Sequence, residues 1–239
     1  MKLIRLVPLL AVIAALMLLI AGPGTRLEFW DFGFGFTLMG WAVYIGLGAA
    51  GLALLFALIP KTRRGNIGVL VVAIVIGVAT AAVPWSLREQ ARSLPRIHDI
   101  TTDTHNPPEF VAVAPLRADA PNPVEYEGEE IARQQREAYP EIQPLETDIY
   151  PAIVFDHALA TAETLGWEIV AADSDIGRIE ATDTTFWFGF KDDVVIRIQG
   201  SDGGSIVDVR SKSRVGLSDV GANAARIRRF MDALEERLY

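Results

Sequence analysis

The chain has 239 residues, of which 51% are hydrophobic and 22% charged, and its formal net charge is −8. This composition excludes a short peptide, a collagen-like repeat and a wholly disordered chain. Residues 1–84 carry 6 basic and 2 acidic side chains, which leaves 16 and 28 for residues 85–239. The acidic second part argues against a nucleic-acid partner. The absence of cysteine excludes disulfides, thiolate nucleophiles, Cys-ligated metals and lipoprotein lipidation.

Three apolar stretches open the chain. They are Leu6–Ala21, Phe32–Pro60 and Ile67–Trp85, and the last two contain no charged residue. A spanning helix needs about 20 apolar residues, so the second and third stretches qualify outright. The first reaches that length only when residues 3–5 are included. We expect a membrane domain of three transmembrane helices in residues 1–85, with a cleaved signal peptide as the alternative for the first stretch.

The basic residues next to these stretches predict an orientation. Lys2, Arg5 and the three basic residues of the 61–66 loop fall on one side of a three-helix membrane domain, and short basic flanks favour the cytoplasm. Arg88, Arg92 and Arg96 follow the third stretch and oppose this assignment. We therefore expect a multi-pass protein of the bacterial inner (cell) membrane, with a cytoplasmic N-terminus and a periplasmic, extracytoplasmic C-terminal domain.

Small residues recur at every fourth position in the second and third stretches. Such faces let helix backbones approach closely in lipid. Two interpretations follow: the protein's own helices pack there, or a membrane-protein partner docks there. Neither stretch contains an ionisable residue with which a proton relay or an ion pathway could work, which argues against a channel or a transporter. The small residues are Ala42, Gly46, Ala50, Ala73, Gly77 and Ala81.

Residues 86–150 leave the membrane as a juxtamembrane helix followed by an extended, proline-rich strap (residues 97–150). The helix, residues 86–96, places Arg88 and Arg92 on one face, where they contact either anionic headgroups or water. Proline, aspartate and threonine keep much of the strap extended, and residues 127–137 are expected to form one exposed helix.

The beginning of the strap also carries four residues of metal-ligating types. Imidazole and carboxylate groups are common metal ligands, but turn chemistry explains the same residues and no motif of fixed spacing is present. We therefore assign neither a metal nor a cofactor. The four residues are His98, Asp99, Asp103 and His105.

Residues 151–239 read as a soluble α+β domain. A helix begins at Pro151 and ends at Gly166, a plausible C-cap, and a second helix covers residues 219–237. Between them the pattern predicts a four-stranded antiparallel meander, and two helices on one face give a two-layer domain. Alternation in the last strand predicts a solvent-exposed charged face of Asp208, Arg210, Lys212 and Arg214. The predicted strands are 167–172, 178–181 continued by 184–190, 194–199 and 205–215.

The densest polar run joins the last strand to the terminal helix. Its three arginines, together with free amides at the start of the helix, can hold a carboxylate, phosphate or sulfate. The alternative is structural, with the arginines bonded to Asp208, Asp219 and carboxylates of the strap. The candidate ligand-binding, partner-binding or structural residues are Arg210, Ser211, Ser213, Arg214, Asp219, Asn223 and Arg226.

No catalytic residue is assigned. Ser211 and Lys212 are neighbours in a strand, so their side chains point to opposite faces, and Ser213 has no evident histidine partner. The G-x-S-x-G elbow of serine hydrolases is absent. His157 is a lone histidine on a helix, a position typical of a packed or surface residue.

The polar run resembles a known family. The pattern Arg210-Ser-x-Ser-Arg214-x-Gly216-x-x-Asp219-x-Gly221-x-Asn223-x-x-Arg226, with Thr101-Thr102-Asp103 and Pro107-Pro108 upstream, is similar to the domain-of-unknown-function family 1499 (DUF1499) over roughly residues 97–238. The resemblance implies the domain boundary and an N-terminal membrane anchor. It implies no reaction.

These observations favour a non-enzymatic membrane protein whose extracytoplasmic domain binds a partner protein or a small anionic ligand through residues 210–226. One alternative is a subunit or assembly factor of a larger membrane complex, which would use the small-residue helix faces. The other is a membrane-anchored hydrolase or transferase acting on an envelope substrate. An enzyme would need an acid/base pair or a nucleophile in a pocket.

Overall fold

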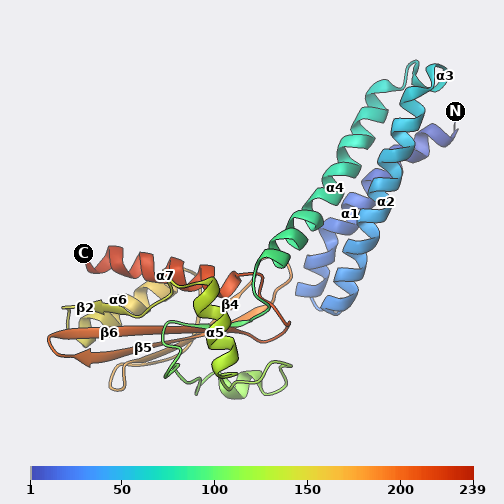
Figure 1. The fold of residues 1–239 in the computed structure, drawn as a ribbon. Coiled ribbons are helices and arrows are strands. Elements are labelled where there is room, and N and C mark those ends of the chain that lie inside the picture. Colours follow the sequence, from blue (N-terminus) through green and yellow to red (C-terminus); the bar gives the residue numbers. More distant parts are fainter. Residues whose placement is uncertain (1) are drawn as a thin grey trace. The chain divides into compact units, whose positions relative to one another are not determined.

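A computed structural model describes residues 2–239 and divides into two compact units (Figure 1). The first unit holds the chain up to Gln90 together with Phe186–Gly189. The second unit holds Ala91–Thr185 and Phe190–Tyr239. Each unit has its own hydrophobic core, and the strap lies in the same unit as the C-terminal residues.

Three helices of the first unit are long and apolar enough to cross a membrane, so the chain is a membrane protein. Asp31 caps the second of them, because its Oδ1 accepts a hydrogen bond from the Phe34 amide at 3.1 Å. The third helix continues to Ser93. The separate juxtamembrane helix expected over residues 86–96 is therefore wrong, because residues 86–93 form the last turns of α4 and residues 94–96 follow it. The helices are α1 (Lys2–Arg26), α2 (Phe32–Leu58), the short α3 (Pro60–Arg63) and α4 (Ile67–Ser93).

The small-residue faces of α2 and α4 meet each other. A Cβ built on Gly77 would lie 2.3 Å from the carbonyl oxygen of Gly46, and one built on Gly46 would lie 3.0 Å from that of Gly77. Ala42 and Ala73 are fully buried in the same bundle. Close backbone approach of this kind is how helices pack in lipid, so these faces hold the protein's own helices together.

Residues 185–190 do not continue the expected strand, which ends at Thr184. Thr185 and Phe190 close a turn, with the Thr185 amide donating to the Phe190 carbonyl at 2.8 Å and the Phe190 amide donating to Thr185 Oγ1 at 2.9 Å. Gly189 has φ +72°, a left-handed conformation that ends a strand and favours glycine. The aromatic residues of this segment therefore lie in a turn, where Phe188 packs within the first unit, 5.0 Å between ring centroids from Phe36.

The second unit contains a six-stranded antiparallel sheet in the order β1-β6-β5-β4-β3, with β2 also paired to β6. The four-stranded meander predicted from the sequence is present as β3 to β6, but the strand count was wrong. Two short strands of the strap pair one after the other along the free side of β6. The strands are β1 (Asp99–Thr101), β2 (Leu145–Thr147), β3 (Glu168–Asp173), β4 (Arg178–Thr184), β5 (Lys191–Ser201) and β6 (Gly204–Ser213).

Two helices, α6 (Pro151–Thr164) and α7 (Ala222–Leu238), cover one face of this sheet (Figure 1). Gly166, at φ +81°, follows the end of α6 as predicted. The core between helices and sheet is apolar: Phe230 of α7 is fully buried and stacks on Trp167 with ring centroids 5.3 Å apart. The α+β class and the positions of both helices are therefore as expected.

The strap carries the 3₁₀ helix η1 (Ala114–Arg117) and the helix α5 (Glu129–Ala138). Its residues 102–127 cover the opposite face of the sheet. Its two ends instead contribute to the core on the helix side, through Ile97, Ile100, Tyr139 and Ile142. Phe110 and Val113 of the strap pack on Val195 of β5. The charged face of β6 was predicted to be solvent-exposed, and this prediction is wrong because the strap buries it. Asp208 and Arg210 are each 2% exposed, and Lys212 is fully buried.

Candidate functional site

The polar run, residues 210–226, divides into two groups of residues that lie on opposite faces of the sheet. Successive residues of a strand point to opposite faces. Arg210 and Arg214 bond to residues on the strap side of the sheet, whereas Ser211 and Ser213 bond to α7. The run therefore contributes to both faces rather than to one surface.

Arg210 of β6 is the centre of the strap-side group. Its Nε and Nη2 donate to the two carboxylate oxygens of Asp99 on β1, at 2.9 and 2.8 Å. Its Nη1 donates to the carbonyl oxygen of Pro108, and its Nη2 donates also to that of Val124, both in the strap. The guanidinium lies 4.8 Å from the ring centroid of Phe110 and 5.4 Å from that of Tyr126. It thus ties the strap to the sheet while its charge is balanced by Asp99.

Arg214 takes part in a second ion-pair cluster on the same side. Its Nη2 donates to Asp193 Oδ1 at 2.8 Å, and Arg117 of η1 donates to Asp193 Oδ2 at 3.1 Å. Thr182 also donates to Asp193. Burial lowers the pKa of Arg117, and Asp193 acts in the opposite direction. One fully buried carboxylate therefore joins β4, β5, the strap and the end of β6.

The helix-side group surrounds Arg226 of α7. Its Nη2 donates to Asp192 at 2.6 Å and its Nε to Asp183 at 2.7 Å. Its Nη1 donates to Ser211 Oγ and to Asn223 Oδ1. Burial alone would lower the pKa of Arg226, but the two aspartates outweigh it and raise the pKa above its ordinary value. Arg226 is 3% exposed, so this cluster lies in the interior.

Asn223 and Asp219 organise the start of α7. Asn223 Nδ2 donates to Ser213 Oγ and to the His98 carbonyl, both at 3.0 Å. Asp219 accepts hydrogen bonds from the amides of Gly221 and Asn223, each at 2.8 Å. Burial raises the pKa of Asp219, and these amide bonds oppose the rise. Asp219 thus occupies the amides that were expected to be free for an anion.

The three arginines of the run do not converge on one site. Arg210 and Arg214 lie on the strap side and Arg226 on the helix side, and each is paired with a carboxylate. The structural interpretation named Asp208, Asp219 and carboxylates of the strap. Asp99 is a strap carboxylate, whereas Asp193, Asp192 and Asp183 belong to the sheet and stand in place of Asp208 and Asp219. Asp208 pairs instead with Arg197, at 2.7 Å.

Three of the four residues of metal-ligating types in the strap have separate partners. Asp99 binds Arg210, Asp103 binds Arg197 at 3.1 Å, and His98 Nε2 lies 2.9 Å from Glu127 Oε1. Within residues 2–239, no group of three or more His, Asp or Glu side chains is arranged to hold a metal ion.

Ser211 and Lys212 lie on opposite sides of β6. Ser211 Oγ contacts Asn223, whereas Lys212 Nζ donates to the Glu125 carbonyl at 2.6 Å and lies 3.1 Å from Asp99 Oδ2. Lys212 is therefore a buried tie between β6 and the strap.

A cleft of about 370 Å³ opens beside Arg210. Arg210 is the residue of the polar run that lines it, and the aromatic residues Phe110 and Tyr126 lie beside it. Burial, followed by the charge of Asp99, raises the pKa of Tyr126 to about 12, so its phenol is neutral at physiological pH. Its enclosed hydroxyl has no hydrogen-bond partner in the described part of the chain. The remaining lining residues are His105, Asn106, Pro107, Glu109, Val124 and Glu125.

Sequence reasoning missed this cleft. Phe110 and Tyr126 stand in a stretch without helical or strand periodicity, and their contact with Arg210 depends on the covering of the sheet by the strap. The available signal was two aromatic residues, each close to an acidic neighbour, in an otherwise polar segment.

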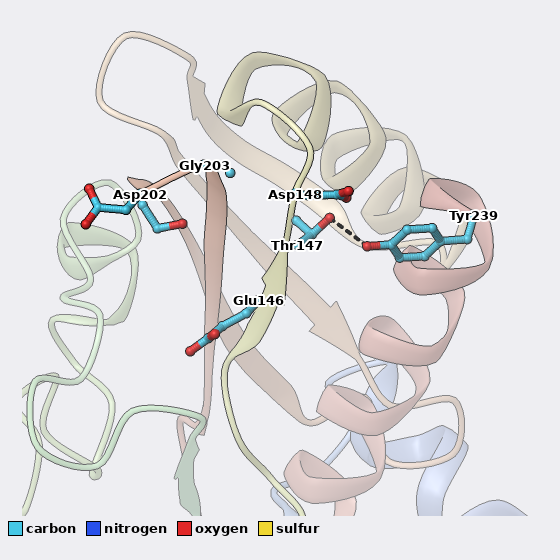
Figure 2. Close-up of a pocket in the computed structure, with 8 residues that line it drawn as sticks. Glu146, Thr147, Asp148, Asp202, Gly203 and Tyr239 are labelled. Atoms are coloured by element: carbon cyan, nitrogen blue, oxygen red, sulfur yellow. Dashed lines mark hydrogen bonds between the residues drawn. The ribbon is translucent and has the colours of Figure 1, made fainter.

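A second pocket, of about 410 Å³, lies at the far end of β6 (Figure 2). It is formed around β2 and the turn between β5 and β6, and Thr147 Oγ1 lies 2.9 Å from the Tyr239 hydroxyl. The carboxylates of Glu146, Asp148 and Asp202 point in different directions (Figure 2). They form no convergent set of ligands, so this pocket adds no candidate chemistry.

Comparison with known proteins identifies a family for the second unit. The model of a family described as "Protein of unknown function (DUF1499)" matches residues 99–234, more than half of the chain. A search of curated proteins gives no match. The matched range contains the ion-pair clusters of Arg210, Arg214 and Arg226 and all the residues that line the Arg210 cleft.

Proposed function

Because the chain belongs to the DUF1499 family and has three helices able to cross a membrane, we propose that it is a membrane-anchored binding protein. The Arg210 cleft is the observation that carries this proposal. It combines apolar, aromatic and polar side chains in a volume of about 370 Å³, within the range of small-ligand sites. The ligand is either a small molecule or a side chain of a partner protein.

The charges of the cleft favour a cationic group. Arg210 is neutralised by Asp99, whereas Glu109 and Glu125 are exposed at the cleft and have no partner among the described side chains. Phe110 and Tyr126 add aromatic surface, which attracts cations. An anion, the ligand type expected from the sequence, would have to displace Asp99 from Arg210. Separating a buried arginine from its carboxylate costs free energy. We therefore expect a cation, and binding of an anion is the alternative outcome of the test.

Binding can be measured on the full-length protein in neutral detergent, by thermal unfolding with added probes. We expect choline or N-acetyl-lysine amide to raise the unfolding temperature and phosphate or acetate to leave it unchanged. Each of Glu109→Gln and Glu125→Gln should weaken the cation effect a few-fold, since an exposed charge pair contributes about 0.2–1 kcal/mol. Glu236→Gln, an exposed position on α7 outside the cleft, is the matched control.

Stabilisation by acetate or phosphate, lost in Arg210→Lys but kept in Glu109→Gln, would contradict the cation proposal and support an anion site. No response to any probe, with wild type and Glu125→Gln unfolding alike throughout, would contradict a small-ligand site in this cleft.

We further propose that the membrane is the bacterial inner membrane, with the DUF1499 domain on the extracytoplasmic side. The basic residues of the 61–66 loop support this orientation. Because the chain has no cysteine, a single introduced thiol reports its own position. In intact cells with a permeabilised outer envelope, a membrane-impermeant maleimide should label Asp202→Cys. It should label Asn66→Cys only after lysis, and the reverse pattern would contradict the orientation.

A further inference from the structure

A groove runs along the outer surface of α2 and α4, within the membrane unit. It has a volume of about 520 Å³ and its walls are almost entirely apolar. Val78 lines one end and Arg88 the other, a distance of about 15 Å along a helix that rises 1.5 Å per residue. This length equals about half of a hydrocarbon core of roughly 30 Å. The groove thus has the length of one lipid leaflet.

The sides of the groove combine small residues with larger aromatic ones. Gly40 and Ala81 keep its floor low, while Tyr44 and Trp85 line it and are 72% and 64% exposed. A Cβ built on Gly40 would meet no atom within 4 Å. The empty space is therefore open to a chain lying along the helices.

Arg88 adds a positive charge at one end of the groove. It is exposed, and it has neither a hydrogen bond nor an ion pair with any residue of the described chain. Trp85 stands one helical turn before it, and tryptophan is typical of the interface between hydrocarbon and headgroups. An unpaired arginine at this depth attracts anionic headgroups.

We propose that this groove binds one anionic phospholipid, with an acyl chain along Gly40 and Ala81 and the headgroup phosphate on Arg88. The apolar walls match the chain, and the unpaired guanidinium matches the phosphate. A transmembrane helix from a second copy would fill the same space, but its apolar surface would leave Arg88 without a counter-charge. The charge therefore selects the lipid.

The test uses native mass spectrometry of the full-length protein released from mixed micelles of phosphatidylglycerol and phosphatidylcholine with identical acyl chains. We expect one retained lipid, with phosphatidylglycerol favoured about fivefold. Arg88→Gln should bring the ratio to about one, because the headgroup loses its counter-charge. Arg64→Gln, which removes an exposed charge outside the groove, should leave the ratio unchanged.

A second pair of variants tests the acyl chain site. Gly40→Leu should reduce retention of both lipids by filling the groove, whereas Gly48→Leu should not. Gly48 lies on the same helix, does not line the groove and also has no atom within 4 Å of an added Cβ. Equal retention of both lipids by the wild type, or a preference unaffected by Arg88→Gln, would overturn the proposal. So would a lipid-free dimer that Gly40→Leu dissociates, since a second copy would then occupy the groove.

Discussion

The two faces of the DUF1499 sheet are covered in different ways. On one face, α6 and α7 pack apolar side chains such as Phe230 against the strands. On the other, the strap is joined to the strands by buried ion pairs, among them Arg210 with Asp99 and Arg117 with Asp193. Helices supply a regular apolar stripe, but an extended segment has few apolar side chains to offer. Each buried charged or backbone group beneath the strap then needs its own ion-pair or hydrogen-bond partner.

The two kinds of contact contribute differently: apolar burial stabilises the fold, whereas ion pairs also determine where each segment lies. Apolar burial is non-directional, so apolar contacts alone do not fix the exact position of a helix on the sheet. A bidentate arginine and carboxylate pair requires a defined geometry. Arg210 and Arg214 each make such a pair and fix the strap on the sheet. Arg226 binds Asp183 and Asp192 with one nitrogen each and fixes the start of α7.

The largest expected losses of unfolding free energy are at Phe230 and Arg226, which lie one turn apart on α7. Phe230→Ala should lower the unfolding free energy by about 3–5 kcal/mol through a cavity. Arg226→Ala should lower it by a similar 3–5 kcal/mol, because Asp192 is left buried without a partner. Chemical denaturation of the full-length protein in detergent measures both. Arg229→Ala, at an exposed position, should change it by less than about 0.5 kcal/mol, and an equally small loss in Arg226→Ala would contradict a structural role for the motif.

A smaller effect is expected where the strap is held by backbone bonds. The fully buried carboxylate of Glu180 accepts hydrogen bonds from the amides of Val111, Ala112 and Val113, at 3.0 to 3.1 Å. Glu180→Ala should cost about 1–3 kcal/mol by leaving these amides unsatisfied. Hydrogen exchange should accelerate in the strap more than in α7. Uniform acceleration over both would show that the two coverings open as one unit.

The smallest expected effect is on the pH dependence of stability, which should differ between Asp103 on the strap side and Asp219 on the helix side. Burial would raise the pKa of Asp103, but amide bonds from Asn106 and His105 and the contact with Arg197 outweigh it and lower the pKa. Its stabilisation is therefore complete above the ordinary value of 3.8 and is lost as pH falls through the lowered pKa. Asp219, whose pKa is raised by burial, acts oppositely: stability falls as pH rises from 3.8 through its folded-state pKa.

Unfolding midpoints between pH 2 and pH 7 measure these contributions. Asp103→Asn should flatten the acid-side loss of stability, and Asp219→Asn should remove the decline on the higher-pH side. Identical profiles for both variants would contradict the opposite signs of the two pKa shifts.

Local patterns in the sequence predicted the elements that depend on neighbouring residues. Gly166 marks the end of α6, and the strands of the meander follow each other directly. The terminal helix was expected from residue 219 and begins three residues later, at Ala222. The apolar stretches likewise identified the three long helices. Each of these features is determined by periodicity, capping or short connections.

The missed features depend on contacts between distant parts of the chain. Asp99 of β1 pairs with Lys212 of β6 across more than a hundred residues, and no local pattern indicates that pairing. The alternation of charged and uncharged residues in β6 shows only that its two faces differ. It does not show whether the charged face contacts solvent or another segment. What covers the charged face is decided by the strap. The Arg210 cleft, formed by the same covering, was unpredictable for the same reason.

The position of β1 and β2 along β6 also bears on self-association. Exposed strand edges are templates for pairing with another chain. In the described chain, one edge of the sheet consists of two strands of three residues each, and the other is β3, whose register shifts between Ile169 and Ala171. Short strands and irregular pairing are poor templates. The sheet is thereby protected against edge-to-edge aggregation.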